Sequence, residues 1–277
     1  PWSKREITLW YYLRKPTMKR VLLTMLFVCF SLILFAQSPP AYIKFRHVSL
    51  EDGLSQLSIY SMFQDSEGFM WFGTEDGLNK YDGYKFTVYK HDPNDPSSIN
   101  SGSIFSICED HLGTLWIGMD NGGLNALNKK TGKFRSFKSD PNDPGSLISN
   151  RVFNVFVDQE GDLWVAAGGL NRLIEGTEKF IRYKQQVGDS NSLSDNYIRA
   201  IYEDKDGILW FGTRDGGINA FDKKSGKFTL YKYISPEPDA GLQENTILCI
   251  TSDNNETIWA GTFGGEIITL DKRTGKF

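Results

Sequence analysis

Short runs in which apolar and polar residues alternate recur along the chain, and each run is broken by a turn sequence. Residues 103–110 read SIFSICED, and their alternation places Ile104 and Cys108 on one face of a strand and Ile107 on the other. The turns between runs are rich in Asp, Asn and Gly, which tight turns prefer. The pattern predicts four short antiparallel strands here, at 103–110, 114–119, 124–128 and 133–138.

The four-strand pattern is repeated, with a tryptophan at the same place near the start of its second strand. These tryptophans follow one another at intervals of 45 to 49 residues. Tandem units of four strands and about 40–50 residues are typical of β-propeller blades, which bury their sheet faces against one another. We therefore predict an all-β fold, a β-propeller of four-stranded antiparallel blades, with about five blades over residues 42–277 and the ring incomplete. The predicted blades are centred on Trp71, Trp116, Trp164, Trp210 and Trp259.

The two ends of the repeat region bear on closure of the ring. IKFRHVS (43–49) resembles the fourth strand of a blade, such as KFRSFK, so it is expected to complete the last blade. Phe277 falls where the fourth strand of the fifth copy has only begun. We therefore expect a propeller whose further blades are missing from this chain.

The first 40 residues lie outside the repeats. MKRVLLTMLFVCFSLILFAQSPP (18–40) has a basic start, an apolar run and then small and polar residues, which predicts a secretory signal peptide at 18–37. Met18 is the natural start in this interpretation, and residues 1–17 are an upstream extension. An uncleaved membrane anchor is the alternative, although the apolar run of about 16 residues is shorter than the ~20 that a spanning helix needs. In either case we expect the repeats on the exported side of the membrane.

Composition narrows the range of functions. The chain has 277 residues, of which 40% are hydrophobic, and a formal net charge of −3. It has no basic stripe, so contact with nucleic acid is not expected. The three histidines show no ligand spacing, and Cys108 and Cys249 are expected to be buried free thiols. No catalytic residue, metal site or cofactor is predicted.

The most specific motifs lie in the first repeat. Residues 45–86 read FRHVSLEDGLSQLSIYSMFQDSEGFMWFGTEDGLNKYDGYKF, and later copies contain variants of LWIGT followed by GGLN. These motifs resemble the two-component regulator propeller family, and the resemblance covers roughly 42–277. It implies the periplasmic sensor region of a Bacteroidetes-type hybrid two-component system histidine kinase.

The resemblance also implies what surrounds the propeller. In that family the blades are followed by an immunoglobulin-like module, a transmembrane helix and a histidine kinase, and none of these motifs occurs in this chain. We therefore expect a sensor without chemistry of its own, which signals to a kinase region elsewhere in the same polypeptide. The full-length protein is expected to be a homodimer anchored in the inner membrane.

Two classes of loop are expected on one face of the propeller: those that enter the first strands and those that join the second and third strands. Loops on a rigid scaffold are where binding residues concentrate. Acidic, basic and aromatic residues in these loops suit a hydroxyl-rich ligand such as an oligosaccharide. Solvated turn residues are the alternative, and the recurrence of Asn100, Asn150, Asn196 and Asn245 indicates loop capping. The candidate ligand-binding residues are Glu75, Asp120, Arg151, Tyr197, Arg214 and Phe263.

Three other functions compete with sensing. A secreted propeller that binds partners without a kinase fits the same residues. The Asp-x-x-Gly-x-x-Trp turns resemble the Asp-box turns of sialidases, but the arginines form no set at matching blade positions, as that chemistry requires. AFDKKSGKF (220–228) resembles the docking repeat of quinoproteins, but Leu230, Phe137 or Tyr183 stands where that repeat has its tryptophan.

Overall fold

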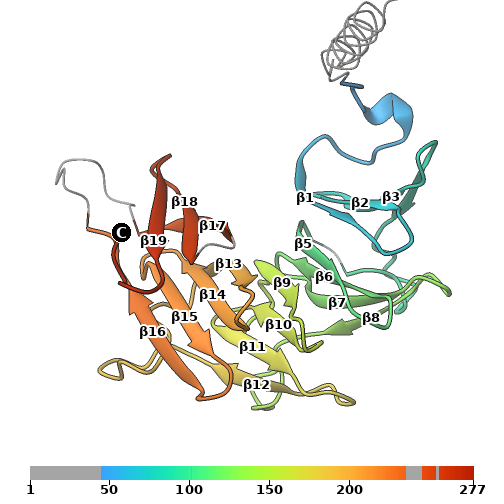
Figure 1. Ribbon diagram of the computed structural model, residues 1–277. Coiled ribbons are helices and arrows are strands. Elements are labelled where there is room, and N and C mark those ends of the chain that lie inside the picture. The colour runs from blue at the N-terminus through green and yellow to red at the C-terminus, as the bar shows by residue number, and fades with distance from the viewer. Residues whose placement is uncertain (1–44, 101, 235–244, 254–255) are drawn as a thin grey trace, which may run out of the picture. The chain divides into compact units, whose positions relative to one another are not determined.

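The computed structural model describes residues 45–100, 102–234, 245–253 and 256–277 (Figure 1). The predicted extension (1–17) and signal peptide (18–37) lie outside these residues and stay predictions. Residues Val48–Phe277 form one compact unit. Within the described ranges, no helix has the length and apolar character needed to cross a bilayer.

Five antiparallel sheets follow one another in chain order, preceded by the short 3-10 helix η1 (Leu50–Asp52). The first sheet contains β1 (Ile59–Gln64), β2 (Met70–Thr74), β3 (Gly77–Tyr81) and β4 (Phe86–Tyr89). The second contains β5 (Ile104–Glu109), β6 (Thr114–Met119), β7 (Gly123–Asn128) and β8 (Lys133–Phe137). The third contains β9 (Asn154–Val157), β10 (Leu163–Ala166), β11 (Leu170–Leu173) and β12 (Phe180–Tyr183). The fourth contains β13 (Ile198–Glu203), β14 (Ile208–Thr213), β15 (Ile218–Asp222) and β16 (Lys227–Tyr231), and the fifth β17 (Ile247–Ser252), β18 (Thr257–Thr262) and β19 (Ile267–Asp271).

This architecture confirms the predicted all-β propeller fold. In each sheet every strand pairs with the next one along the chain, and the first strands of consecutive sheets contact one another. We call the contact between two consecutive sheets a seam. In the described part of the chain the first and fifth sheets form no seam, so the ring is open, as predicted.

A recurring aspartate shapes the turn between the first and second strands. Asp110 accepts the backbone N–H of Leu112 at 3.0 Å and of Thr114 at 2.8 Å, and Gly113 adopts a left-handed φ of 79°. Its other carboxylate oxygen accepts the indole N–H of Trp116 at 2.8 Å. One side chain therefore folds the turn and orients the tryptophan. The same indole bond joins Asp65 to Trp71, Asp158 to Trp164 and Asp204 to Trp210.

The tryptophans lie in the seams, as the repeat predicts. Trp116 shares a core cluster with Val152 and Leu163 of the third sheet, and the other seams are built in the same way. Burial of this apolar surface is the main force that joins the sheets. The tryptophans of the first four sheets are at most 4% exposed, whereas Trp259 is 41% exposed. Among the described residues, no further sheet covers its face.

The predicted alternation of residues 103–110 is wrong at its start. The register of β5 against β6 shifts between Ile104 and Ser106, which marks a bulge. Ile104 therefore joins Ile107 in the core shared with the first sheet, while Cys108 packs toward the third. A bulge inserts one extra residue, so a strict period of two assigns Ile104 to the wrong face.

One other expectation is also wrong, and one stays a prediction. Residues 45–49 form no strand of their own, and since the last blade is expected outside this chain, their pairing with it stays a prediction. Cys249 is exposed rather than buried, because its neighbour Ile250 points into the seam with the fourth sheet and Cys249 points the other way. Cys108 is a partly buried free thiol, and burial raises its pKa.

Candidate ligand-binding face

The first strands β1, β5, β9, β13 and β17 lie next to one another in chain order (Figure 1). The loops that enter these strands meet the turns between the second and third strands. Asp120 donates its N–H to the carbonyl of Ser103 at 2.8 Å, and Arg214 donates to that of Tyr197 at 2.9 Å. The two classes of loop therefore share one face, which we call the loop face.

A buried asparagine in the third strand anchors each of the first four entering loops. The side-chain oxygen of Asn125 accepts the N–H of Asn100 at 3.2 Å, and that of Asn219 accepts the N–H of Ser194 at 3.0 Å. Buried amides with satisfied hydrogen bonds hold a loop in one geometry. The fifth sheet has Ile268 at this position. The other two anchors join Asn79 to Ser55 and Asn171 to Ile148.

The predicted loop caps are confirmed for three of the four asparagines. Asn150, Asn196 and Asn245 each accept a backbone N–H from the start of their own loop, at 2.7, 2.8 and 3.0 Å. Asn100 instead donates its side-chain N–H to the carbonyl of Gly122 at 2.8 Å. It lies two positions earlier in its loop, so it is not the equivalent residue.

Four aromatic rings form a row on the loop face. Tyr60 and Phe105 lie at the register shifts of β1 and β5, and their rings meet edge to face with centroids 5.5 Å apart. Phe105 stacks on Phe153 at 5.8 Å, and Phe153 contacts Tyr197 at 4.5 Å. We call Tyr60, Phe105, Phe153 and Tyr197 the aromatic row. It offers partly exposed ring faces next to anchored loops.

Three guanidinium groups stack on the last two rings of the aromatic row. Arg151 lies 5.3 Å from the ring centroid of Phe153. Arg199 lies 5.1 Å from that centroid and 5.3 Å from that of Tyr197. The guanidinium of Arg214 lies 5.3 Å from the ring centroid of Tyr197. These are cation–π distances, and stacking leaves the N–H edge of a planar guanidinium able to bind a partner.

Acidic groups pair with these guanidinium groups unequally. The Nε atom of Arg151 lies 2.7 Å from Oδ1 of Asp120. The Nε atom of Arg214 lies 3.9 Å from Oδ2 of Asp215, and both side chains are exposed. Arg199 has no ion pair with any described residue, and its buried Nε has no hydrogen-bond partner there. Thus Arg151 is paired, Arg214 is loosely paired, and Arg199 has no ion pair among the described residues.

The other end of the aromatic row is acidic. The hydroxyl of Tyr60 donates to a carboxylate oxygen of Glu75 at 2.5 Å. This hydrogen bond, together with the charge of Glu75, raises the pKa of Tyr60. The loop face therefore runs from a carboxylate at the first sheet to guanidinium groups at the third and fourth.

The structure brings five of the six candidate residues together. Tyr197 belongs to the aromatic row, and Arg151 and Arg214 stack on it. Glu75 and Asp120 bond to Tyr60 and Arg151, as described above. Phe263 lies apart, because it is 62% exposed and contacts no other ring in the described part of the chain. That these residues bind a ligand stays a prediction.

Sequence reasoning missed four residues of this face: Tyr60, Phe105, Phe153 and Arg199. Each directly follows an aliphatic residue at or just before the start of the first strand of its sheet, and this residue is buried in all but the first sheet. That position was a usable signal, since it holds an aromatic residue three times and an arginine once. The register shifts at Tyr60, Phe105 and Arg199 have no comparable signal in the sequence.

Lysines bridge three of the four seams near the turns between the first and second strands. Lys129 lies 3.2 Å from Asp65 of the preceding sheet and 2.5 Å from Glu109 of its own sheet. We call this arrangement the lysine clamp. In the other two clamps, Lys223 lies 2.9 Å from both Asp158 and Glu203, and Lys272 lies 2.8 Å from Asp204 and 2.9 Å from Asp206.

The clamps change the pKa of their aspartates. Burial alone would raise the pKa of Asp158, but hydrogen bonds from Lys223 and Trp164 outweigh it and lower the pKa. The pKa values of Asp65 and Asp204 are lowered in the same way. All three carboxylates are therefore held in their charged form.

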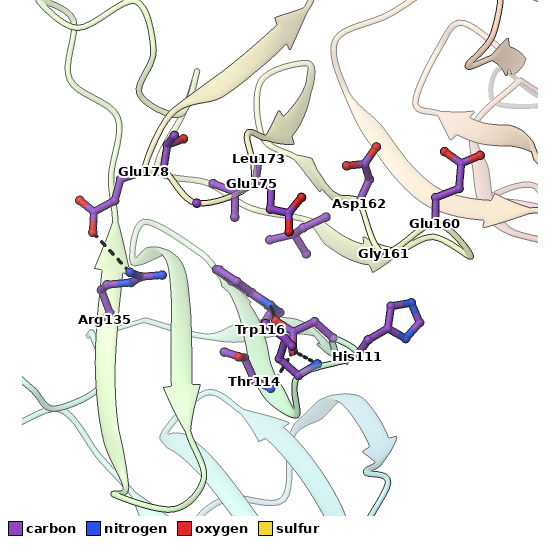
Figure 2. Close-up of a pocket in the computed structure, with 15 residues that line it drawn as sticks. His111, Thr114, Trp116, Arg135, Glu160, Gly161, Asp162, Leu173, Glu175 and Glu178 are labelled. Atoms are coloured by element: carbon purple, nitrogen blue, oxygen red, sulfur yellow. Dashed lines mark hydrogen bonds and ion pairs between the residues drawn. The ribbon is translucent and has the colours of Figure 1, made fainter.

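The seam between the second and third sheets lacks a clamp. At equal loop length, the position of the lysine is taken by Glu175, and that of the sheet's own acid by Val157. A pocket of about 670 Å³ occupies this seam (Figure 2). Arg135 and Glu178 form an ion pair of 3.6 Å at its rim. The ionisable residues that line it are Asp110, His111, Arg135, Glu160, Asp162, Glu175 and Glu178, and Figure 2 labels all of them except Asp110.

One group of carboxylates is close enough to hold a metal ion. It consists of Asp158, Glu160 and Asp162. Asp158 already accepts hydrogen bonds from Trp164 at 2.8 Å and Lys223 at 2.9 Å. The lysine supplies the positive charge there, so we assign no metal site to this group.

Comparison with known proteins agrees with the fold. A row of stacked antiparallel sheets, four of which have their tryptophan buried in a seam, is a β-propeller. Four of its repeats match the model of the two component regulator propeller family. The matched segments are residues 53–76, 98–121, 146–169 and 192–215, one at each of the first four sheets.

Several known proteins are similar to this chain over part of their length. The extracellular domain of the hybrid two component system BT3049 from B. thetaiotaomicron is 30% identical, with a TM-score of 0.72, over 84% of this chain and 31% of that chain. Histidine kinase P4 of Formosa agariphila is 40% identical over 77 residues, which are 26% of this chain and 6% of that protein. Virginiamycin B lyase from Staphylococcus aureus, at 19% identity and a TM-score of 0.52 over 76% of this chain and 68% of that chain, shares the fold. This chain thus spans under a third of the hybrid system domain and a small part of the kinase.

Proposed function

We propose that the chain is the extracytoplasmic ligand-sensing propeller of a hybrid two-component sensor histidine kinase. The observation that carries the proposal is the similarity over 84% of the chain to the extracellular domain of such a system. The four family repeats and the kinase relative support it. In this proposal, the remaining blades, the kinase region and the contacts of a homodimer belong to other parts of the same polypeptide.

The proposed location is the periplasm. It is supported by the extracellular placement of the similar domain and by the signal peptide predicted at 18–37. The full-length protein would then be anchored in the inner membrane, with the kinase on the cytoplasmic side.

The proposed ligand is an oligosaccharide bound on the loop face. The aromatic row offers ring faces to the apolar faces of sugars, and the nearby charged groups can bond to hydroxyls. The asparagine anchors hold the entering loops in place before any ligand arrives, which lowers the entropy cost of binding. The proposed role is binding rather than catalysis.

A sialidase-like enzyme is the catalytic alternative. The structure does bring Arg151, Arg199 and Arg214 together, although they occupy different positions in their repeats. The pair that could act as nucleophile and base, Tyr60 and Glu75, lies at the opposite end of the aromatic row. This separation favours binding, and no observation favours a quinoprotein.

The gene beyond codon 277 provides the first test. We expect it to encode further tryptophan-bearing repeats, a membrane helix and a histidine kinase. A stop codon directly after Phe277 would overturn the signalling proposal and favour a secreted binding scaffold.

The second test uses membranes that contain the full-length protein. Autophosphorylation from labelled ATP is measured with and without a panel of oligosaccharides, and we expect one of them to change its rate. Tyr197→Ala should abolish the response, whereas Tyr84→Ala, at a 92% exposed residue away from the loop face, should retain it. A response that survives Tyr197→Ala would place the ligand elsewhere.

A further inference from the structure

We infer that the loop face selects an anionic glycan, whose sugar rings carry carboxylate or sulfate groups. The inference rests on the proposed function and names the ligand class for it. It is carried by Arg199, whose guanidinium lies against the rings of both Phe153 and Tyr197 without an ion pair among the described residues.

Arg199 stands where the other sheets have an apolar or aromatic side chain. The equivalent residues are Tyr60, Phe105, Phe153 and Leu248. The aromatic row therefore continues with a guanidinium at this position, stacked on the preceding ring. Its Nε atom is buried without a hydrogen-bond partner, which is costly unless a ligand supplies an acceptor.

The acidic groups around Arg199 are engaged elsewhere. Asp120 pairs with Arg151 at 2.7 Å. The carboxylate of Asp195 accepts the backbone N–H groups of Tyr197 and Asp215, both at 3.0 Å. Glu75 accepts the hydroxyl of Tyr60 at the far end of the row. None of these is within ion-pair distance of Arg199, so its charge is left for a ligand.

Arg214 is a second guanidinium at the same ring. Both guanidinium groups lie 5.3 Å from the ring centroid of Tyr197. Two like charges near one ring repel each other, and a bound anion reduces that repulsion. A planar carboxylate or a sulfate matches the paired N–H edge of a guanidinium, whereas a neutral sugar leaves Arg199 without an ionic partner and Arg214 with only its loose contact to Asp215.

The test compares charged and neutral glycans of the same length. Isothermal titration calorimetry measures binding of oligogalacturonate, its methyl ester and a sulfated galacto-oligosaccharide to the purified chain. We expect oligogalacturonate or the sulfated glycan to bind at least about tenfold more tightly than the ester, with an affinity that falls as salt rises. The better of the two charged glycans identifies carboxylate or sulfate as the recognised group.

Variants locate the site. Arg199→Met should weaken binding of the charged glycan by about tenfold or more and leave the ester unchanged. Arg199→Lys keeps the charge but loses the planar N–H edge, so its affinity for the charged glycan should lie between that of the parent chain and that of Arg199→Met. Arg135→Met removes one exposed arginine far from the loop face and should bind as the parent chain does. Urea denaturation of each variant separates loss of binding from loss of folding.

The outcomes distinguish the two proposals. Equal binding of oligogalacturonate and its ester overturns the inference but agrees with a glycan sensor. Tight binding of charged glycans that Arg199→Met does not weaken also overturns it. Failure of every glycan to bind overturns both the inference and the proposed oligosaccharide ligand.

Discussion

Each buried tryptophan contributes more than apolar area, because its indole N–H has a fixed carboxylate partner. Asp158 accepts this bond from Trp164 while also closing the turn between β9 and β10. Asp110 does the same in the second sheet. The turn and the seam are therefore coupled through one side chain in each of the first four sheets.

Replacement of a tryptophan by phenylalanine isolates this coupling. Trp164→Phe keeps an aromatic ring in the seam but removes the N–H that Asp158 accepts at 2.8 Å. Loss of a hydrogen bond to a buried charged group costs about 1.5–3 kcal/mol, so we expect the free energy of unfolding in urea to fall by this amount. Trp259→Phe, at a 41% exposed residue, is the control and should cost less than about 1 kcal/mol. Equal losses in the two variants would contradict the argument.

The position and role of a recurring residue were easier to predict than the face of the sheet on which a side chain lies. The tryptophan positions and the capping role of Asn150, Asn196 and Asn245 could be predicted, because each recurs at a fixed distance from a turn signal. The orientation of Phe105 could not, since a bulge changes the face of a side chain without changing the composition of the strand.

At the scale of strands and sheets, the seams differ although the sheets are alike. Three seams have a lysine clamp, and the seam between the second and third sheets has Glu175 in its place. Glu175 adds a negative charge to a pocket that already contains Asp110 and Asp162. This seam is therefore expected to be the weakest of the four.

A single substitution tests this expectation. Glu175→Lys places an ammonium group where the other seams have one, and we expect the free energy of unfolding to rise by about 1 kcal/mol. The gain needs charged carboxylates. In the existing clamps folding lowers the aspartate pKa, so their contribution is present above the unfolded value of about 3.9 and is lost as the pH falls through the folded value.

The matched control is Glu175→Gln, which removes the charge without adding an ammonium group. Urea denaturation of both variants is compared at pH 7 and pH 3. Glu175→Lys should be the more stable variant at pH 7, and the difference should be smaller at pH 3, where the carboxylates begin to be protonated. A lysine variant no more stable than the glutamine variant at pH 7 would show that the pocket cannot form a clamp.

The number and order of the strands followed from the hydrophobic pattern, but the clamps did not. Lys129, Lys223 and Lys272 look like ordinary turn lysines in the sequence. Their partners belong to the neighbouring sheet, some 65 residues away, such as Asp65 for Lys129. Only the packing of consecutive sheets shows that these lysines form ion pairs across the seams.

At the scale of the whole molecule, the fifth sheet has one uncovered face. Trp259 and Ile267 occupy the positions that are buried in the other sheets, and both are exposed. An apolar sheet face of this kind favours association with other molecules. The chain studied alone should therefore self-associate as its concentration rises.

A charge on this face should suppress the association. Ile267→Lys is expected to keep the chain monomeric at concentrations where the parent chain associates, as measured by size-exclusion chromatography with light scattering, and to leave the unfolding midpoint unchanged. The control is Leu170→Lys at the equivalent position of the third sheet, which is fully buried. It should destabilise the fold strongly, because an unpaired charge would be buried. Association of Ile267→Lys at the same concentration as the parent would rule out this face.

The incomplete ring was predicted correctly, whereas pairing of the N-terminal segment stays a prediction. Residues 45–49 resemble a fourth strand in sequence and form no strand of their own. A single strand has little preference of its own and needs a partner edge, so its sequence alone cannot show whether it will pair. The tryptophans were the better guide, because the exposed Trp259 shows directly which sheet face has no neighbour among the described residues.

The unclamped seam also bears on how the molecule could respond to a ligand. In a row of units that contact only their neighbours, cooperativity breaks at the weakest interface. The first two sheets and the last three therefore form two blocks that meet beside Glu175. On the loop face the same boundary is crossed by the ion pair of Asp120 with Arg151 and by the stacked rings of Phe105 and Phe153. A ligand that contacts residues on both sides of this boundary would bind only when the two blocks are joined. Its binding free energy would therefore stabilise the seam and make the row of sheets unfold as one unit.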